Sequence, residues 1–179
     1  LEITRDIAER FNNIYGDVFT IPEAYIGKKG AKIMSLQEPG KKMSKSDTNA
    51  NATILLLDDT DTIIRKFKRA VTDSESEVRY AEEKPGISNL MDIYSAVTGK
   101  TYEEIEKEFA GKGYGDFKLA VGETVADHLK PLQERYEQLM KDKAYIESMI
   151  KQNDEKAAYY ANKTLRKVQK KVGLTERIR

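Results

Sequence analysis

The apolar residues of this chain change their spacing near residue 50, and this change constrains the fold more than any other feature. From residue 58 onward they recur every three or four positions, a spacing that predicts amphipathic helices. Before residue 50, only Leu1 to Gly16 keeps that spacing, and the short apolar segment Lys32–Leu36 is typical of a strand. We therefore predict a mainly α chain, in which the end of a doubly wound α/β domain (residues 1–50) precedes an all-α domain (residues 51–179).

A loop rich in lysine and serine follows the predicted strand. Residues 42–46 have the sequence Lys-Met-Ser-Lys-Ser, and Pro39 and Gly40 precede them. The ammonium groups of Lys42 and Lys45 can each donate three hydrogen bonds, and each is a compact charge on a flexible stem. Such a loop suits a polyphosphate. Its place at the carboxyl end of a strand, where open α/β sheets bind ligands, favours this interpretation over a solvated surface loop.

Composition excludes several classes of protein. The 179 residues are 39% hydrophobic and 34% charged, as expected of a globular chain. Lys and Arg (31) nearly balance Asp and Glu (30), so total charge gives no reason to expect nucleic acid. The absence of cysteine excludes disulfides and thiolate metal sites, and a single histidine argues against a zinc centre, so we expect no protein metal site.

The start of the chain and its apolar runs indicate origin and location. No initiator Met precedes Leu1, which already lies in a helical pattern, so we expect a piece of a longer protein. No signal peptide opens the sequence and no apolar run is long enough to span a bilayer. These features predict a cytoplasmic protein.

Caps and glycines predict where the later helices begin and end. Asp58, Asp59 or Thr60 should cap one helix, and Ser88 should cap the next. Thr101 and Glu104 form a capping box. The remaining predictions are a helix end at Gly99, a glycine connector over 111–115, a long helix from Asp116 that Pro131 kinks or divides, a short helix over 144–150, and a last helix capped by Asn153 or Asp154.

Basic residues gather in two of the predicted helices. One group lies opposite the apolar face of the helix near residue 65 and contains Arg65, Lys66, Lys68 and Arg69. The other lies at the C-terminal end and contains Lys163, Arg166, Lys167, Lys170, Lys171, Arg177 and Arg179. The C-terminal group suits contacts to RNA phosphates, but it also suits the helix dipole alone.

The Lys-Met-Ser-Lys-Ser string resembles the signature loop of class I aminoacyl-tRNA synthetases, and the likeness extends over nearly the whole chain. Several further segments are similar to the C-terminal half of the bacterial tryptophanyl-tRNA synthetase family. They are residues 4–8, 33–36, 70–75, 79–80 and 84–90. The resemblance implies a Rossmann-like catalytic domain whose last part is residues 1–50, followed by a helical domain that meets the tRNA anticodon.

The resemblance also implies a reaction and a set of site residues. Enzymes of this family activate tryptophan with ATP to tryptophanyl-AMP and transfer it to tRNA(Trp). By this likeness Lys42 and Lys45 are the catalytic residues, because they face charge that develops on pyrophosphate. For Ile33, ordinary core packing is the alternative. The residues implied to bind ATP are Ile33, Lys42, Met43, Ser44, Lys45 and Ser46.

The same family likeness implies the partners. ATP would bind with Mg²⁺ as its usual counter-ion, and the partners would be tRNA(Trp) and tryptophan, with a homodimer as the state of the full-length parent. The His-containing signature and the tryptophan pocket of the family have no counterpart here, so we expect the piece to be inactive alone.

Two other classes of function compete with this interpretation. The chain could be a non-catalytic RNA-binding helical module with an inherited phosphate-binding loop. Residues upstream of Leu1 would decide, because a synthetase needs the His-containing signature there. A protein-interaction bundle would need an exposed apolar face, whereas the predicted helices are conventionally amphipathic.

Overall fold

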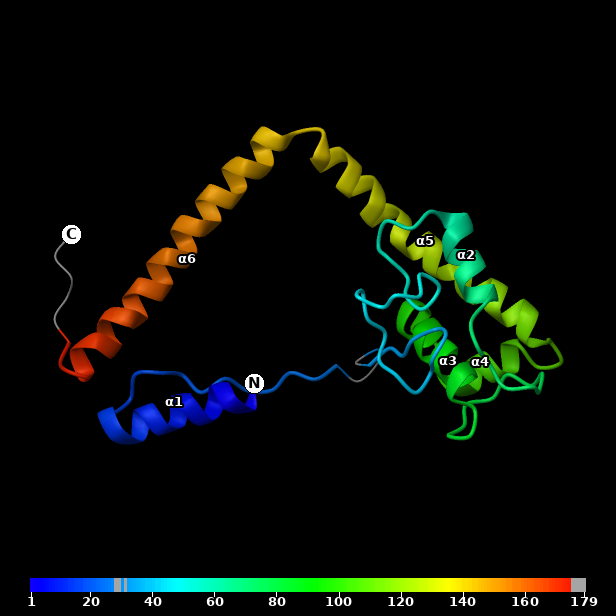
Figure 1. Cartoon of the computed structure of the whole chain (residues 1–179), viewed down its shortest axis with the longest axis horizontal. Coiled ribbons are helices and arrows are strands. Elements are labelled where there is room, and N and C mark those ends of the chain that lie inside the picture. The colour runs from blue at the N-terminus through cyan, green and yellow to red at the C-terminus, as the bar shows by residue number, and fades with distance from the viewer. Residues whose placement is uncertain (28–29, 31, 175–179) are drawn as a thin grey trace. The chain divides into compact units, whose positions relative to one another are not determined.

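The computed structural model describes residues 1–27, 30 and 32–174 of the chain, and this part is mainly helical (Figure 1). No helix in these ranges is both long and apolar enough to cross a membrane. The helices are α1 (Glu2–Tyr15), α2 (Thr60–Lys68), α3 (Pro85–Thr98), α4 (Tyr102–Glu108), α5 (Tyr114–Met140) and α6 (Lys143–Lys171). The predicted fold class, mainly α, is confirmed.

The chain divides into two compact units. One contains residues 1–26 and 139–179, and the other contains residues 27–138. The lysine- and serine-rich loop therefore belongs to the same unit as α2, α3, α4 and most of α5. The predicted boundary between an α/β domain and an all-α domain at residue 50 stays a prediction.

The core of the unit formed by residues 27–138 lies where α2, α3 and α4 gather against the first half of α5 (Figure 1). Phe67, Ile87 and Phe117, from three different helices, are each at most 1% exposed. Gly122 lets α2 approach α5 closely, since a Cβ there would lie 3.0 Å from the Cα of Ile64. This core is the platform on which the loop rests.

The other unit contains α1 and the segment that follows it. Asn12 accepts hydrogen bonds from the amides of Val18 and Phe19 and donates to the Phe19 carbonyl, so residues 17–19 turn back against α1. Phe11 packs edge-on against Phe19 at 5.0 Å between ring centroids. As predicted, α1 ends at Gly16, which has a positive φ of 82°.

The predicted strand at Lys32–Leu36 is present only as one antiparallel bridge, between Met34 and Lys42. A β-ladder forms only where a second segment runs alongside the first over several residues and pairs with it. Here the chain turns away after Leu36, whose amide bonds the carbonyl of Ala52 instead.

Three predicted helix boundaries were wrong. Pro85 occupies the first turn of α3, so Ser88 lies inside the helix and is not its cap. The long helix begins at Tyr114 rather than Asp116, and Pro131 lies within it without dividing it. The two predicted helices on either side of Asn153 and Asp154 are one helix, residues 143–171. Its cap is Asp142. The boundaries at Asp59, Gly99 and the Thr101 capping box are confirmed.

Candidate nucleotide-binding loop

The loop begins in the second arm of a short hairpin and continues beyond it. The amide of Ser35 donates to the carbonyl of Lys41 at 2.8 Å, and the amide of Met43 donates to the carbonyl of Ile33 at 3.0 Å. These two bonds flank the Met34–Lys42 bridge. The hairpin thus fixes the backbone position from which the Lys42 side chain extends into solvent.

The hairpin is fastened to the platform through Leu36, which is 1% exposed. Its amide donates to the carbonyl of Ala52 at 3.0 Å, and its carbonyl accepts from the amide of Val71 at 2.8 Å. The backbone of the hairpin is therefore tied both to the segment after the loop and to the end of the α2 region.

Beyond the hairpin, short polar contacts shape the loop. The hydroxyls of Ser44 and Ser46 lie 3.0 Å apart, and the Ser46 amide donates to the Ser44 hydroxyl. Thr53 donates to the Ser44 carbonyl at 2.7 Å. The Asp47 carboxylate accepts from the amide of Asn49. The two serine hydroxyls therefore face each other at the surface, and the hydroxyl of Thr53 holds the backbone carbonyl of Ser44.

The predicted ATP-binding residues divide by exposure. Ile33 and Met43 are half-buried and pack against the hydrophobic core. The exposed members are Lys42, Ser44, Lys45 and Ser46. The structure brings the predicted residues into one hairpin and its loop, with the apolar members inward and the donors outward. An anion approaching from solvent would meet the ammonium and hydroxyl groups first.

Lys41 differs from the two neighbouring lysines of the loop because it has its own carboxylate. It pairs with Glu38 at 2.5 Å, and this hydrogen bond raises the pKa of Lys41 above its ordinary value. Its charge is thus already compensated on the surface. In the described ranges, no group of three His, Asp or Glu side chains is placed to hold a metal ion.

Asn89 contacts the hairpin, and the sequence analysis did not predict this. Its side-chain amide accepts from the Met34 amide at 2.8 Å and donates to the Met34 carbonyl at 2.9 Å. The signal in the sequence was only that an asparagine stands in the apolar stretch of α3, between Ser88 and Leu90.

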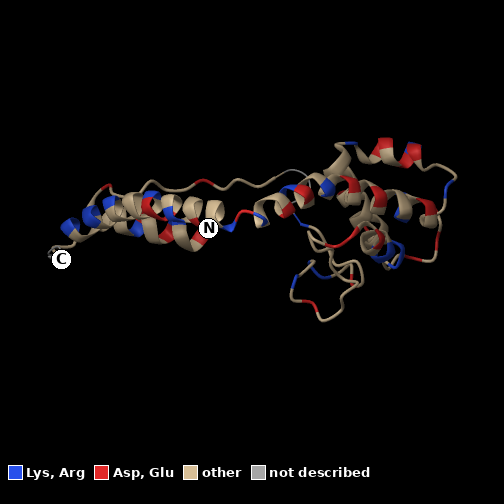
Figure 2. Ribbon diagram, turned by 90° about the horizontal axis from the view of Figure 1, so that it is seen from above, with Lys and Arg blue, Asp and Glu red and all other residues tan. Residues whose placement is uncertain are grey.

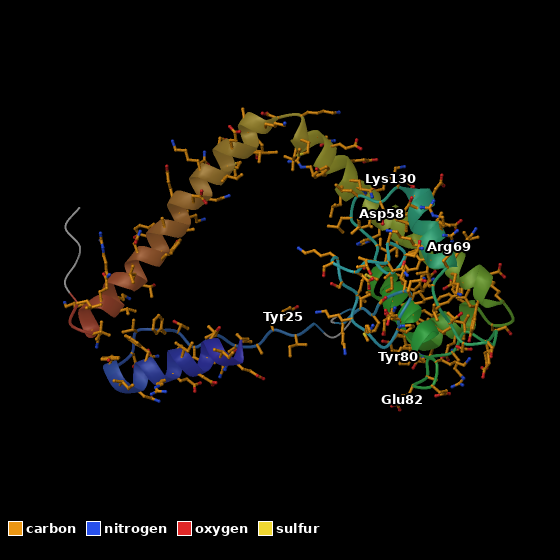
Figure 3. The ribbon with its side chains drawn as sticks, viewed as in Figure 1. Tyr25, Asp58, Arg69, Tyr80, Glu82 and Lys130 are labelled. Carbon is orange, nitrogen blue, oxygen red and sulfur yellow. The ribbon has the colours of Figure 1, made fainter. Side chains whose placement is uncertain are left out.

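The basic group of α2 is smaller than predicted. Lys66 is 5% exposed and points inward, where it pairs with Asp58 at 2.5 Å and donates to the Thr53 carbonyl at 2.9 Å. Asp58 lies where the chain enters α2 (Figure 3). Arg65, Lys68 and Arg69 are exposed. Lys66 therefore stabilises the segment after the loop instead of offering a charge to solvent.

The basic group of α6 is exposed in its described part. Lys and Arg gather over the last turns of this helix (Figure 2). Arg177 and Arg179 lie outside the described residues. The exposed members are Lys163, Arg166, Lys167, Lys170 and Lys171. This group could contact a polyanion, but the helix has no buried residue that shows what it packs against.

Comparison with known proteins identifies the family. The family described as tRNA synthetases class I (W and Y) matches residues 1–130. The chain belongs to this family. The resemblance inferred from the Lys-Met-Ser-Lys-Ser loop and the five further segments is thereby confirmed.

Relatives within the class I synthetases agree on tryptophan. The chain is 53% identical to the tryptophan–tRNA ligase of Clostridium tetani, over 97% of the chain and 51% of that protein. It is 52% identical to the tryptophan–tRNA ligase of Listeria monocytogenes, over 97% of the chain and 53% of that protein. The chain therefore spans about half the length of the curated relatives it matches.

Solved synthetase structures have the same fold. The tryptophanyl-tRNA synthetase of Mycoplasma pneumoniae matches 97% of the chain with a TM-score of 0.86 at 29% identity, over 53% of its own length. That of Campylobacter jejuni, complexed with ADP and tryptophan, matches with a TM-score of 0.64 at 28% identity, over the same shares of each chain.

Proposed function

We propose that this chain is the C-terminal part of a tryptophan–tRNA ligase that activates tryptophan with ATP and transfers the tryptophanyl group to tRNA(Trp). The observation that carries the proposal is a set of relatives named tryptophan–tRNA ligase, to which the chain is 51–53% identical over nearly its whole length. A lysine-rich loop at the end of a fastened hairpin supports the ATP-dependent step.

The first step would be displacement at the α-phosphorus of ATP. A carboxylate oxygen of tryptophan forms a bond to that phosphorus while the bond to the bridging oxygen of pyrophosphate breaks, and pyrophosphate leaves with the electron pair. Lys42 and Lys45 would donate hydrogen bonds to the leaving group as its charge grows. Donors that already face developing charge lower the barrier without reorganisation, so these two lysines are the proposed catalytic residues.

The other loop residues would hold the nucleotide. Ser44 and Ser46 are exposed beside the lysines and could complete the phosphate contacts. Ile33 and Met43 present half-buried apolar groups at the base of the hairpin, which suits an adenine ring. Mg²⁺ would bind to the phosphates of ATP and neutralise part of their charge.

The helical part would bind tRNA. The proposed domains are a catalytic remnant, residues 1–50, and an anticodon-binding domain, residues 51–179. The exposed basic group of α6 supports contacts to RNA phosphates. The tryptophan pocket would lie in the other half of the enzyme, which we propose to be a cytoplasmic homodimer.

Isotope exchange between ATP and pyrophosphate tests the proposal. The full-length protein is expected to catalyse exchange with tryptophan and not with tyrosine, and to charge tRNA with tryptophan. The 179-residue chain alone is expected to show no exchange. Binding of tRNA by a full-length protein that never supports exchange would favour the RNA-binding module instead.

A further inference from the structure

The side-chain amide of Asn89 satisfies both backbone groups of Met34, a residue 55 positions away in sequence. The distances are 2.8 Å for the bond from the Met34 amide and 2.9 Å for the bond to the Met34 carbonyl. This paired arrangement is the one that a neighbouring strand would provide, because a carboxamide carries the same donor and acceptor as a peptide group.

The geometry of the hairpin explains why Met34 needs such a partner. Met34 and Lys42 form the kind of antiparallel pair in which the flanking residues exchange the hydrogen bonds. The amide and carbonyl of Met34 therefore point away from Lys42, toward α3. Without Asn89 these two groups would lose their protein partners at a half-buried position.

Asn89 itself is firmly held. It is 3% exposed and lies in α3 beside Ile87 and Leu90, which are at most 1% exposed. A side chain this buried on a packed helix has little freedom to move, and its bonds transmit the position of α3 to the hairpin. Ile33 and Met43, on either side of the Met34–Lys42 bridge, pack against the same core.

A hollow of about 320 Å³ borders the contact between Asn89 and Met34. It is lined in part by Met34, Pro39, Tyr80 and Asn89. On that side, open space and not a packed side chain lies next to the contact.

We propose that Asn89 is a positioning residue for the nucleotide loop: by clamping the backbone of Met34 it fixes the hairpin from which Lys42 and Lys45 reach ATP. The inference rests on the proposed function of that loop. Asn89 acts through Met34 and touches no reacting atom.

The chain contains a matched control one residue away. Ser88 is 8% exposed, lies on the same helix and also bonds both backbone groups of one residue, Ala81, at 3.1 and 2.8 Å. Ala81 belongs to the segment before α3, not to the hairpin. Ser88→Ala therefore removes the same kind of contact from the same helix without releasing the loop.

The first test measures hydrogen exchange of backbone amides by NMR in the 179-residue chain. Asn89→Ala is expected to speed exchange at Met34, Ser35 and Met43 by about tenfold or more, since two hydrogen bonds are lost. Ser88→Ala should speed exchange at Ala81 and leave the hairpin amides unchanged. Unchanged exchange at Met34 and Met43 in Asn89→Ala would overturn the proposal.

The second test uses kinetics of the full-length protein. Asn89→Ala, and the nearly isosteric Asn89→Leu, which lacks both the donor and the acceptor for Met34, are expected to raise KM for ATP or lower the rate of exchange by about tenfold, with KM for tryptophan within about twofold of wild type. Asn89→Leu keeps the side-chain volume and buries no charge, so the test stands even if the alanine variant folds poorly.

A double-mutant cycle shows whether the effect passes through the loop. In a Lys45→Ala background, Asn89→Ala should cost less than it does in the wild type, because one of the two lysines that it positions is already gone. Full additivity, or an equal effect of Ser88→Ala, would overturn the proposal. If wild type shows no exchange at all, the proposed function fails, whereas the amide-exchange result still decides whether Asn89 holds the hairpin.

Discussion

The ammonium group of Lys84 donates a hydrogen bond of 2.8 Å to the hydroxyl of Tyr114, which in turn donates to the carboxylate of Asp73 at 2.7 Å. Lys84 also pairs with Asp73 at 3.2 Å and with Glu75. Its side chain is only 2% exposed. Because Lys84 precedes α3 and Tyr114 begins α5, this cluster fastens both helices to the segment that carries Asp73.

Loss of this cluster should destabilise the fold. Tyr114→Phe removes one donor and one acceptor at a buried site and is expected to lower the free energy of unfolding by about 1–3 kcal/mol. Lys84→Met should cost more, since it leaves the Asp73 carboxylate without its cation. Urea denaturation followed by circular dichroism measures both. Tyr145→Phe, at an exposed tyrosine of α6, is the control and should have no effect.

The same cluster predicts a dependence of stability on pH. Burial by itself would raise the pKa of Asp73, but hydrogen bonds from Tyr114, the Glu75 amide and Lys84 outweigh it and hold that pKa below its ordinary value. A lowered carboxylate pKa contributes stability that is complete above the unfolded value of about 3.9 and is lost as pH falls through the folded value. Burial would lower the pKa of Lys84, but its bonds to Glu75, Tyr114 and Asp73 raise it.

The melting temperature of the wild type should therefore fall as pH drops below about 5. In Asp73→Asn, which is less stable at neutral pH, the fall should be shallower. Thermal melts of both proteins between about pH 3 and 7 check this. Parallel curves would show that Asp73 is not the group that titrates.

A change in the loop should affect chemistry more than binding. In the full-length protein, Lys45→Ala is expected to slow formation of tryptophanyl-AMP by about 100- to 1000-fold, because the lost donor faces charge that develops in the transition state. Tryptophan affinity should change little. Rapid-quench measurement of adenylate formation checks the rate. Lys41→Ala, which removes an ammonium already paired with Glu38, should stay near wild type.

Binding of tRNA should depend on the basic group of α6. Each phosphate neutralised releases counter-ions, so the logarithm of affinity should fall with the logarithm of salt at a slope of about −0.7 to −0.9 per phosphate. Lys167→Ala with Lys170→Ala should make the slope shallower. Fluorescence titrations of labelled tRNA at several salt concentrations measure it. The control, Lys151→Ala with Lys156→Ala, removes two exposed charges from an earlier part of the same helix.

Glycine at position 86 is required by packing. A Cβ there would lie 2.3 Å from the carbonyl oxygen of Val71 and 3.0 Å from the Cα of Thr72, both backbone atoms that cannot turn aside. Gly86→Ala should therefore lower the free energy of unfolding by about 1–3 kcal/mol. Gly115→Ala, in a helix with open space around it, should be neutral or stabilising by up to about 1 kcal/mol. Equal denaturation midpoints would refute this.

The parts of the fold that depend on neighbours in sequence could be predicted. The capping box of Thr101 and Glu104 and the helix end at Gly99 involve residues within one turn, so their signals are complete in the sequence. Ser88 was misjudged because serine is a frequent cap residue, whereas Pro85, which favours the first turn of a helix, marks where α3 begins.

The parts that depend on distant contacts could not be predicted. The sequence predicted a phosphate site in the loop, but it did not predict that Asn89 bonds the backbone of Met34. It placed Lys66 on a polar face by periodicity, whereas Asp58 and the Thr53 carbonyl draw its ammonium inward. A polar side chain on a helix faces either solvent or a buried partner, and helical spacing alone does not distinguish the two.

The distance along the chain between Met34 and Asn89 has a consequence during synthesis on the ribosome. Met34 emerges 55 residues before Asn89, the residue that holds it. At translation rates of about 5–20 residues per second, that interval is roughly 3 to 11 s. During this interval the nascent hairpin lacks the hydrogen bonds with Asn89, so the segment that carries Lys42 and Lys45 is not yet held in place. The ribosome thus completes the Lys-Met-Ser-Lys-Ser sequence well before the chain can fold the hairpin that carries it.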